Sequence, residues 1–340
     1  MAQARAIPVV AAETPVVGNR WATTRFDWAM VLVASLPMAG AYLDAWAHSH
    51  VPSLETFFTP WHAVLYTGLL AITAFMAVSF ALGYRRTQDW RTALPAGYGL
   101  SLVGCLMFAA GGVADMAWHL AFGIEQDFQA ALSPTHLFLM LSLGLIVAGP
   151  LRAGWRGPGR SFGFPALLSA GLLLSTVSFF QAFDHPFVTV RALTAGIDNE
   201  ELGVLGIVIE SGVVTALALA LVRRFDLPLG GLAFVLGLNA ALLTAIGNRY
   251  SMVVVAVAAG LVADLVRVLN ADRAGVRSFR LFAFALPTLV FAFYFANVAR
   301  LGGVAWSTHV WVGSIAMAGA VGWLISYLMV PSGQTDWRSA

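Results

Sequence analysis

Residues 44–48 read Asp-Ala-Trp-Ala-His and residues 60–62 read Pro-Trp-His; the order returns as Asp-Met-Ala-Trp-His at 115–119 and Pro-Thr-His at 134–136. Both copies therefore share Asp-x3-His, a linker and Pro-x-His, and each joins the end of one apolar segment to the start of the next. An aspartate and a histidine four positions apart lie on one face of a helix. The later histidine can face them from the following helix. The pattern predicts a repeated helical hairpin with polar side chains at its closed end.

Each predicted hairpin brings one carboxylate and two imidazoles together. The two sets are Asp44, His48 and His62, and Asp115, His119 and His136. Carboxylate and imidazole groups are ligands of transition metals, so we predict that these six residues bind metal. Structural Asp–His hydrogen bonds between helices are the alternative. Hydration at a membrane surface gives no reason for the same residues to recur in the same order, and the repeat therefore favours a metal site.

Other polar residues lie close to these sets in the sequence. The linkers carry Glu55, Glu125 and Asp127, each of which we interpret as a solvated loop acid rather than a ligand or an acceptor for an imidazole N–H. His50 is predicted to be solvated, while His185 and His309 are candidates for further ligands.

One acidic residue is expected well inside a membrane segment. Glu210 lies in the middle of an apolar run, where a charged group needs a partner or a function. We expect it to be protonated or to pair with Asn239 or another polar group, and it is a candidate for a proton path.

The composition indicates an all-α, polytopic helical membrane protein. Of the 340 residues, 59% are hydrophobic and 11% are charged, and the apolar residues fall into repeated runs of about 20, the length of a membrane-spanning helix. The short alternating segments of a transmembrane barrel are not seen. The net charge of +2 gives no indication of nucleic-acid binding, and the single cysteine, Cys105, excludes a disulfide framework and a cysteine-based metal site.

We predict about ten transmembrane helices, built from repeated hairpins, with both termini in the cytoplasm. The predicted spans are 27–47, 61–83, 95–121, 135–152, 165–183, 203–222, 228–247, 250–268, 280–299 and 309–330. Sixteen of the 19 arginines then lie on one side, leaving Arg191, Arg249 and Arg300 on the other. By the positive-inside rule, the protein spans the cytoplasmic membrane and both Asp/His sets face outside.

The same reading divides the chain into four parts. Residues 1–26 are a cytoplasmic tail, 27–152 form a two-hairpin repeat that carries the Asp/His sets, 165–330 form a six-helix remainder, and 331–340 are a second cytoplasmic tail. The Gly/Pro/Arg-rich stretch 153–164 is the expected divide. We interpret the whole chain as five hairpins, of which the first two keep the full ligand set.

The Asp-x3-His pattern followed by a second histidine resembles the metal site of the C subunit of the copper membrane monooxygenases, the particulate methane and ammonia enzymes. In that family the pattern reads Asp-x3-His-x12-His across adjacent membrane helices. Here it occurs twice, with 13 residues between His48 and His62 and 16 between His119 and His136. The resemblance implies an outward-facing Asp/His/His site and suggests copper, ahead of iron or zinc.

These observations favour a membrane metalloprotein with one mononuclear site per hairpin or a shared dinuclear site, acting as a copper or iron oxidoreductase on an apolar small molecule that arrives through the lipid. The catalytic residues are unknown, and the expected partners are membrane lipid and either partner subunits or further copies of the chain. The alternatives are a metal-ion or proton-coupled transporter, a haem protein with His62, His136 or His309 as axial ligands, and a zinc-dependent lipid hydrolase.

Overall fold

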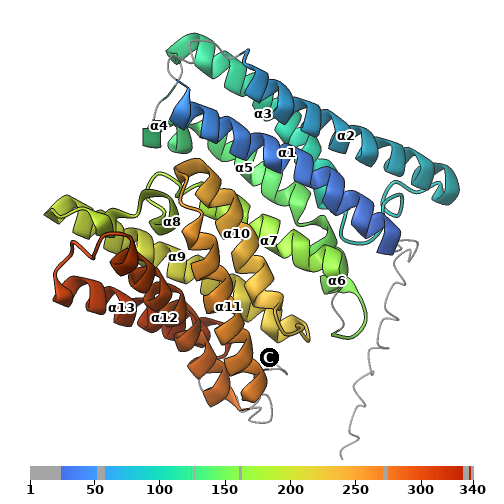
Figure 1. The fold of residues 1–340 in the computed structure, drawn as a ribbon. Helices are drawn as coiled ribbons and strands as arrows, with labels where there is room; N and C mark the ends of the chain where they lie inside the picture. Colours follow the sequence, from blue (N-terminus) through green and yellow to red (C-terminus); the bar gives the residue numbers. More distant parts are fainter. Residues whose placement is uncertain are drawn as a thin grey trace, which may run out of the picture.

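The computed structural model describes residues 24–51, 58–123, 125, 127–160, 163–270, 275–331 and 337 (Figure 1). The described part of the chain is built from helices and contains no β-strand. The predicted all-α class is therefore confirmed. Most of the two tails expected at 1–26 and 331–340 lies outside the described residues.

The helices follow the predicted spans closely. They are α1 (Thr24–His50), α2 (Pro60–Thr87), α3 (Gly99–Phe122), α4 (Asp127–Leu132), α5 (Pro134–Val147), α6 (Gly149–Arg156), α7 (Phe164–Phe179), α8 (Pro186–Thr189), η1 (Arg191–Leu193), α9 (Ile197–Arg224), α10 (Gly231–Gly247), α11 (Ser251–Leu269), α12 (Val276–Leu301) and α13 (Thr308–Met329).

In the described part of the chain, seven helices are long and apolar enough to cross a membrane: α1, α2, α3, α9, α11, α12 and α13. The pair α5 and α6 forms a further, bent candidate, and α7 and α10 are shorter apolar helices. The protein is therefore a multi-pass helical membrane protein. A full count of ten crossings stays a prediction.

Two of the predicted spans are interrupted or shortened. The fourth bends by 45° between α5 and α6, where Pro150 occupies the first turn of α6; proline cannot continue a helical hydrogen-bond ladder. The fifth ends at Phe179 rather than at residue 183, and the chain then makes turns, α8 and η1 before α9. These turns bring Gln181, Asp184 and His185 back against α9, and they place α8 against α10.

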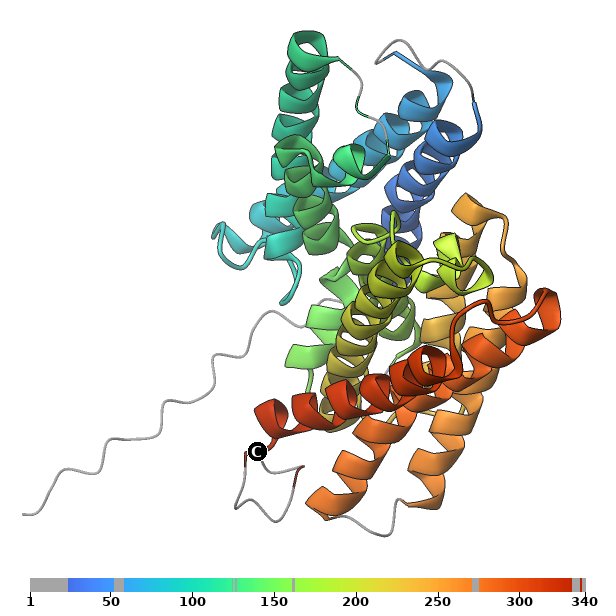
Figure 2. The same ribbon diagram turned by 90° about the vertical axis from the view of Figure 1, so that its left-hand side faces the viewer.

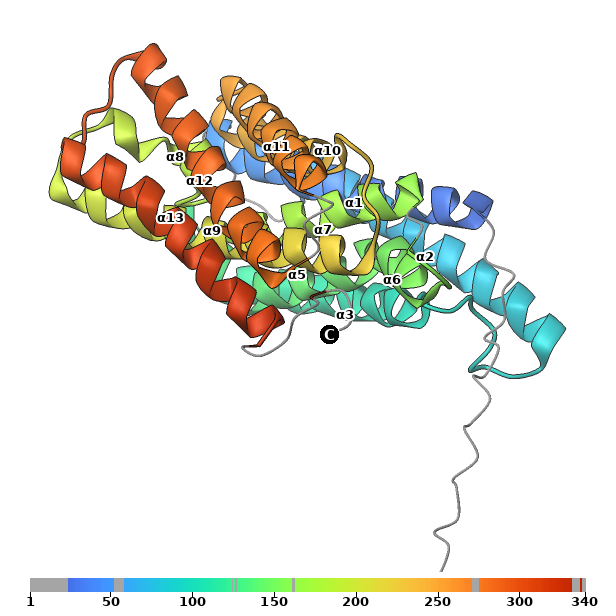
Figure 3. The ribbon, with the colours of Figure 1, turned by 90° about the horizontal axis from the view of Figure 1, so that it is seen from below.

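Helices that follow one another in the sequence pack as hairpins. Close pairs are α1 with α2, α3 with α5, α10 with α11, and α12 with α13. The hairpin expected between α7 and α9 is less developed, because α7 packs mainly against α10. The α1, α2, α3 and α5 helices lie at the top of Figure 2, and α12 and α13 lie below them. Seen from below, α12 and α13 lie on one side of the molecule and α2 on the other (Figure 3).

Buried apolar side chains form two cores. One is built largely from α1, α2, α3 and α5, and the other largely from α9 to α13. Helix α7 gives Leu172 to the first core and Leu167 to the second, and α10 gives Leu243 and Leu232 in the same way. The two halves of the chain are thus joined by the two shorter apolar helices.

A glycine one turn before each site aspartate brings the two helices of each hairpin close together. A Cβ added at Gly40 would lie 2.5 Å from the Cα of Leu65 in α2, and one added at Gly111 would lie 2.9 Å from the Leu139 side chain in α5. Small residues allow this approach in membrane helices. The repeated pattern is therefore longer than Asp-x3-His: both copies read Gly-x3-Asp-x3-His.

Candidate metal centre

The six residues predicted to bind metal come together as two groups of three. Within each group, one potential ligand atom from every residue lies within 4.8 Å of the others. Helices α1 and α2 form the first triad from Asp44, His48 and His62, and α3 and α5 form the second from Asp115, His119 and His136. Each group could hold a metal ion.

The first triad is centred on one oxygen of Asp44. Its Oδ2 lies 3.6 Å from Nε2 of His48, one turn later on α1, and 3.5 Å from Nε2 of His62 in α2. The other oxygen, Oδ1, is buried and has no hydrogen-bond partner among the described residues. The His48 side chain is 29% exposed, so this triad is open to its surroundings on the His48 side.

The second triad is more enclosed. Asp115 Oδ2 lies 3.5 Å from Nε2 of His119, and Oδ1 lies 3.3 Å from Nε2 of His136. The Asp115 side chain is 2% exposed and that of His119 is 4% exposed. The Thr135 hydroxyl donates to Asp115 Oδ1 at 2.7 Å, which fixes the carboxylate between the two imidazoles.

The start of α2 and the start of α5 place the later histidines in the same way. Thr59 and Ser133 are the N-cap residues, a proline follows each, and the histidine is the third helical residue. The Thr59 hydroxyl accepts from the backbone N–H of His62 at 3.1 Å, and the Ser133 hydroxyl accepts from that of His136 at 3.3 Å. This is the ordinary chemistry of a helix start, and here it sets the histidine on the helix face that meets the aspartate.

The hydrogen bonds at Nδ1 of His136 and His119 determine which ring nitrogen of each neutral imidazole carries the proton. The Nδ1 atom of His136 lies 2.5 Å from the carbonyl oxygen of Ala130, which can only accept, so Nδ1 carries the proton. The Nδ1 atom of His119 faces Glu125 Oε2 at 3.0 Å and the carbonyl oxygen of Gly123 at 3.2 Å. When both rings are neutral, their Nε2 lone pairs point at the Asp115 carboxylate, and a cation would satisfy the three electron-pair donors that then face one another.

Glu125 corrects one interpretation of the sequence. We expected a solvated loop acid, but its side chain is 13% exposed and its Oε2 lies 3.0 Å from Nδ1 of His119. The Gly123 carbonyl oxygen fixes the tautomer of His119, and a carboxylate close to the distal nitrogen of a ligating histidine raises the basicity of the ligand. Glu55 and the side chain of Asp127 lie outside the described residues.

The two triads are near enough to influence each other. Asp44 interacts electrostatically with Asp115 and His136 across the interface between the hairpins, and His48 does so with His119. Tyr66 lies within electrostatic range of both aspartates, and its ring packs where a Cβ on Gly112 would be. The two triads are thus neighbours, each with its own three potential ligands.

The remaining histidines lie apart from the triads. His50 is exposed, and its ring contacts the carbonyl oxygen of Trp46 and the amide of Asn248. His185 is fully buried and faces Glu210, and His309 is exposed in the first turn of α13. None of the three belongs to a described group with metal-ligand spacing.

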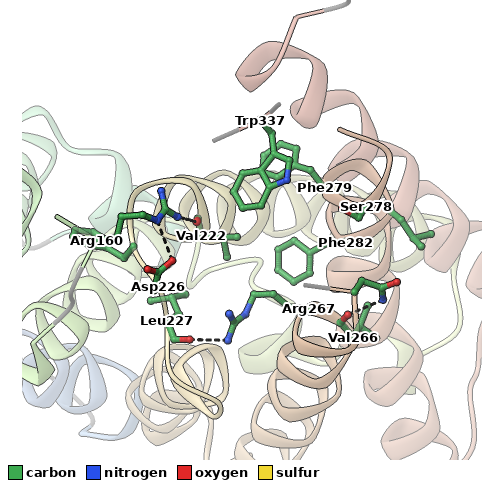
Figure 4. Close-up of a pocket in the computed structure, with 13 residues that line it drawn as sticks. Arg160, Val222, Asp226, Leu227, Val266, Arg267, Ser278, Phe279, Phe282 and Trp337 are labelled. Carbon is green, nitrogen blue, oxygen red and sulfur yellow. Dashed lines mark hydrogen bonds and ion pairs between the residues drawn. The ribbon is translucent and has the colours of Figure 1, made fainter. Parts of the chain in front are cut away.

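A cavity of about 110 Å³ lies away from the triads, between the end of α9, the end of α11 and the start of α12 (Figure 4). Its arginines are occupied by the protein itself. Arg160 pairs with Asp226 at 2.9 Å, and Arg267 donates to the carbonyl oxygen of Leu227 at 2.9 Å. These contacts hold helix ends against the neighbouring loops, which is a structural role. The two triads are therefore the better candidates for a functional site.

Comparison with known proteins adds no assignment: no family model, curated protein or solved structure matches this chain.

Proposed function

We propose that the chain is a membrane metalloprotein that holds a transition-metal ion at each Asp/His/His triad, and that the triads face the outside of the cytoplasmic membrane. Copper is our first choice of metal, ahead of iron and zinc. The proposed activity is oxidation, with dioxygen as the oxidant, of an apolar small molecule that reaches the site from the lipid.

The second triad carries the metal assignment. Two imidazoles with their protons on Nδ1 direct Nε2 at a buried carboxylate that has a threonine hydroxyl on one oxygen. A metal ion satisfies all three ligands at once, and it also compensates a carboxylate that burial would otherwise penalise. The distal acceptors of both histidines match the surroundings of metal-bound histidine in general.

The ligand type supports a redox-active metal without fixing it. Imidazole suits copper, iron and zinc, and a carboxylate leaves the same choice open. Three protein ligands leave room for a further molecule in the coordination sphere, as in catalytic rather than structural sites. The resemblance of the repeated pattern to the copper monooxygenase subunit is the argument for copper.

The surroundings of the second triad favour an apolar substrate. Large apolar side chains next to its histidines in the sequence point outward: Leu120 is 76% exposed and Leu137 is 40% exposed. In a multi-pass membrane protein such side chains face lipid or another membrane segment. A molecule dissolved in the bilayer could therefore come close to His119 and His136 without crossing a charged surface.

Outward orientation is proposed from the chain direction and the arginines. The triads lie where α1 and α3 end and α2 and α5 begin. Sixteen of the 19 arginines lie in the tails or in the segments that join the helices at the ends opposite the triads. Arginine accumulates on the cytoplasmic side of membrane proteins.

Metal analysis with an optical spectrum of the purified protein tests the proposal and its rivals. The expected result is copper or iron bound in proportion to intact triads, with no Soret band. A Soret band would favour a haem protein, and colourless protein with stoichiometric zinc would favour a hydrolase. Metal that enters liposomes only when the protein is present would favour transport.

A further inference from the structure

A second buried polar cluster lies apart from the triads. It contains Ser178 in α7, Gln181 and His185 after α7, Glu210 in α9 and Asn239 in α10, and every one of these side chains is at least nine-tenths buried. Glu210 is the fourteenth residue of α9, which places it about 20 Å along the helix axis from the start of that helix. The cluster therefore lies at the middle of a helix that is long and apolar enough to cross a membrane.

Glu210 is the centre of this cluster. Its Oε2 accepts a hydrogen bond from Gln181 Nε2 at 2.5 Å and one from the Ser178 hydroxyl at 3.3 Å. The two groups that touch it are neutral, so they stabilise the negative charge without compensating it.

His185 lies next to Glu210, but a neutral imidazole does not balance the negative charge of the carboxylate. The backbone N–H of Phe187 donates to His185 Nδ1 at 3.1 Å, so the ring proton of the neutral imidazole is on Nε2. That atom lies 3.3 Å from Glu210 Oε2, but the two are not aligned for a hydrogen bond. His185 is thus a further neutral group beside the carboxylate.

Two amide oxygens in the cluster have no donor. The side-chain nitrogen of Gln181 donates to Glu210, and that of Asn239 donates to Ser178 Oγ at 3.2 Å. Gln181 Oε1 and Asn239 Oδ1 are buried and have no hydrogen-bond partner among the described residues. Carboxylate, amide and hydroxyl oxygens are the ligands that hard cations prefer, and burying them without a partner is unfavourable.

We propose that Glu210, Gln181, Asn239 and Ser178 form a second cation site inside the membrane region, and that its ligand is a monovalent cation, either sodium or a proton. A single positive charge balances Glu210. Sodium would in addition use the two amide oxygens, whereas a proton would occupy the carboxylate alone. The site differs from the triads in chemistry, because it consists of oxygen ligands and no histidine is needed as a ligand.

Other ionisable groups surround the proposed site. Tyr42 of α1 lies within electrostatic range of Glu210, and His185 approaches from the segment before α8. Asp184 lies against Gly206, one turn before Glu210 on α9, and pairs with Arg191. The contacts from α7 and α10 are Ser178 and Asn239, which do not titrate. Any pH dependence must therefore be assigned by substitution at Glu210.

Thermal unfolding of the purified full-length protein tests this site. The wild type, Glu210→Gln and the exposed control Glu201→Gln are compared in sodium chloride and choline chloride at equal ionic strength, over a series of pH values. A ligand that binds the folded state raises Tm. If the cation is sodium, sodium raises the Tm of the wild type and of the control, and the effect is lost in Glu210→Gln. Asn239→Leu should then need at least about tenfold more sodium for the same shift, since it loses one ligand.

The proton gives a different result in the same experiment. The Tm would be equal in the two salts but would depend on pH in the wild type and the control, with that dependence changed in Glu210→Gln. Identical responses of wild type and Glu210→Gln to both sodium and pH would overturn the proposal. If the glutamine variant does not fold, Glu210→Asp keeps the charge and moves it; a sodium and pH response unchanged from the wild type would again contradict the site.

Discussion

The Nε2 atom of His136 lies 3.3 Å from Oδ1 of Asp115, while Nδ1 of the same ring hydrogen-bonds to the Ala130 carbonyl oxygen. With a neutral ring, this contact joins two acceptors. Either a metal ion lies on the Nε2 side in the functional protein, or His136 is protonated and the contact is a structural ion pair. The two cases predict opposite effects of removing the charge.

Asp115→Asn separates the two cases. Asparagine keeps the oxygen that accepts from Thr135 and can offer its N–H to Nε2 of His119, which faces the other carboxylate oxygen. It also removes a buried negative charge, so in chelator its thermal stability should equal or exceed that of the wild type. Bound metal at this triad should be lost. If the contact were a buried ion pair, breaking it would instead cost about 3–5 kcal/mol, which a large drop in Tm in chelator would reveal.

Glu125→Gln tests the carboxylate behind His119. The Gly123 carbonyl oxygen still accepts from Nδ1, but the nearby negative charge that raises the basicity of the ligand is gone. We expect metal affinity at the second triad to fall about 10- to 100-fold, measured by competition with a chelator. The exposed Glu201→Gln is the control, and equal affinities in the two variants would show that Glu125 has no part in the site.

Gly40→Ala tests the close contact that brings Asp44 towards His62. The new methyl group would meet the backbone of Leu65, so α1 and α2 must separate, at a cost of about 1–3 kcal/mol. Metal at the first triad should fall as well. Gly313→Ala, where an added Cβ has no neighbour within 4 Å, should change stability by less than about 0.5 kcal/mol. Equal unfolding curves for the two variants would contradict the packing argument.

Orientation can be tested with single cysteines, because the native Cys105 is buried. Cysteines at Ser49 and Gln129, both exposed near the triads, should react with a membrane-impermeant thiol reagent added to intact cells. A cysteine at Gln88, at the other end of α2, should react only after lysis. The reverse pattern would place the triads in the cytoplasm.

Much of this arrangement could be predicted from the sequence because it depends on local patterns. Runs of apolar residues located the helices, and the Asp-x3-His and Pro-x-His spacings put the six candidate ligands on facing helix surfaces. Glycine at positions 40 and 111 was equally visible, and its spacing from the aspartates could have extended the repeat.

The rest depends on contacts between segments that are distant in the sequence. His185 was a candidate metal ligand, but the shortened α7 turns it towards Glu210 instead. Asn239 does not bond Glu210 directly; Ser178 lies between them. The Ala130 carbonyl could not be foreseen as the partner of His136 because the short helix α4 had not been predicted.

Whether the sites share a pocket is a separate prediction. Because Asp44 interacts electrostatically with Asp115 and His136, we expect His119→Ala to change the electron paramagnetic resonance spectrum of the metal that remains at the first triad. Loss of one metal equivalent with an unchanged spectrum of the other ion would mean that the triads are independent.

The most direct test of the account is the metal content of the purified protein and of its aspartate variants. We predict one transition-metal ion per triad in the wild type, loss of one ion in Asp44→Asn and in Asp115→Asn, and loss of both in the double variant. His50→Ala, next to the first triad but outside it, should keep the wild-type content. Folded double variant with undiminished metal, or wild type that takes up no transition metal when it is supplied, would contradict the account.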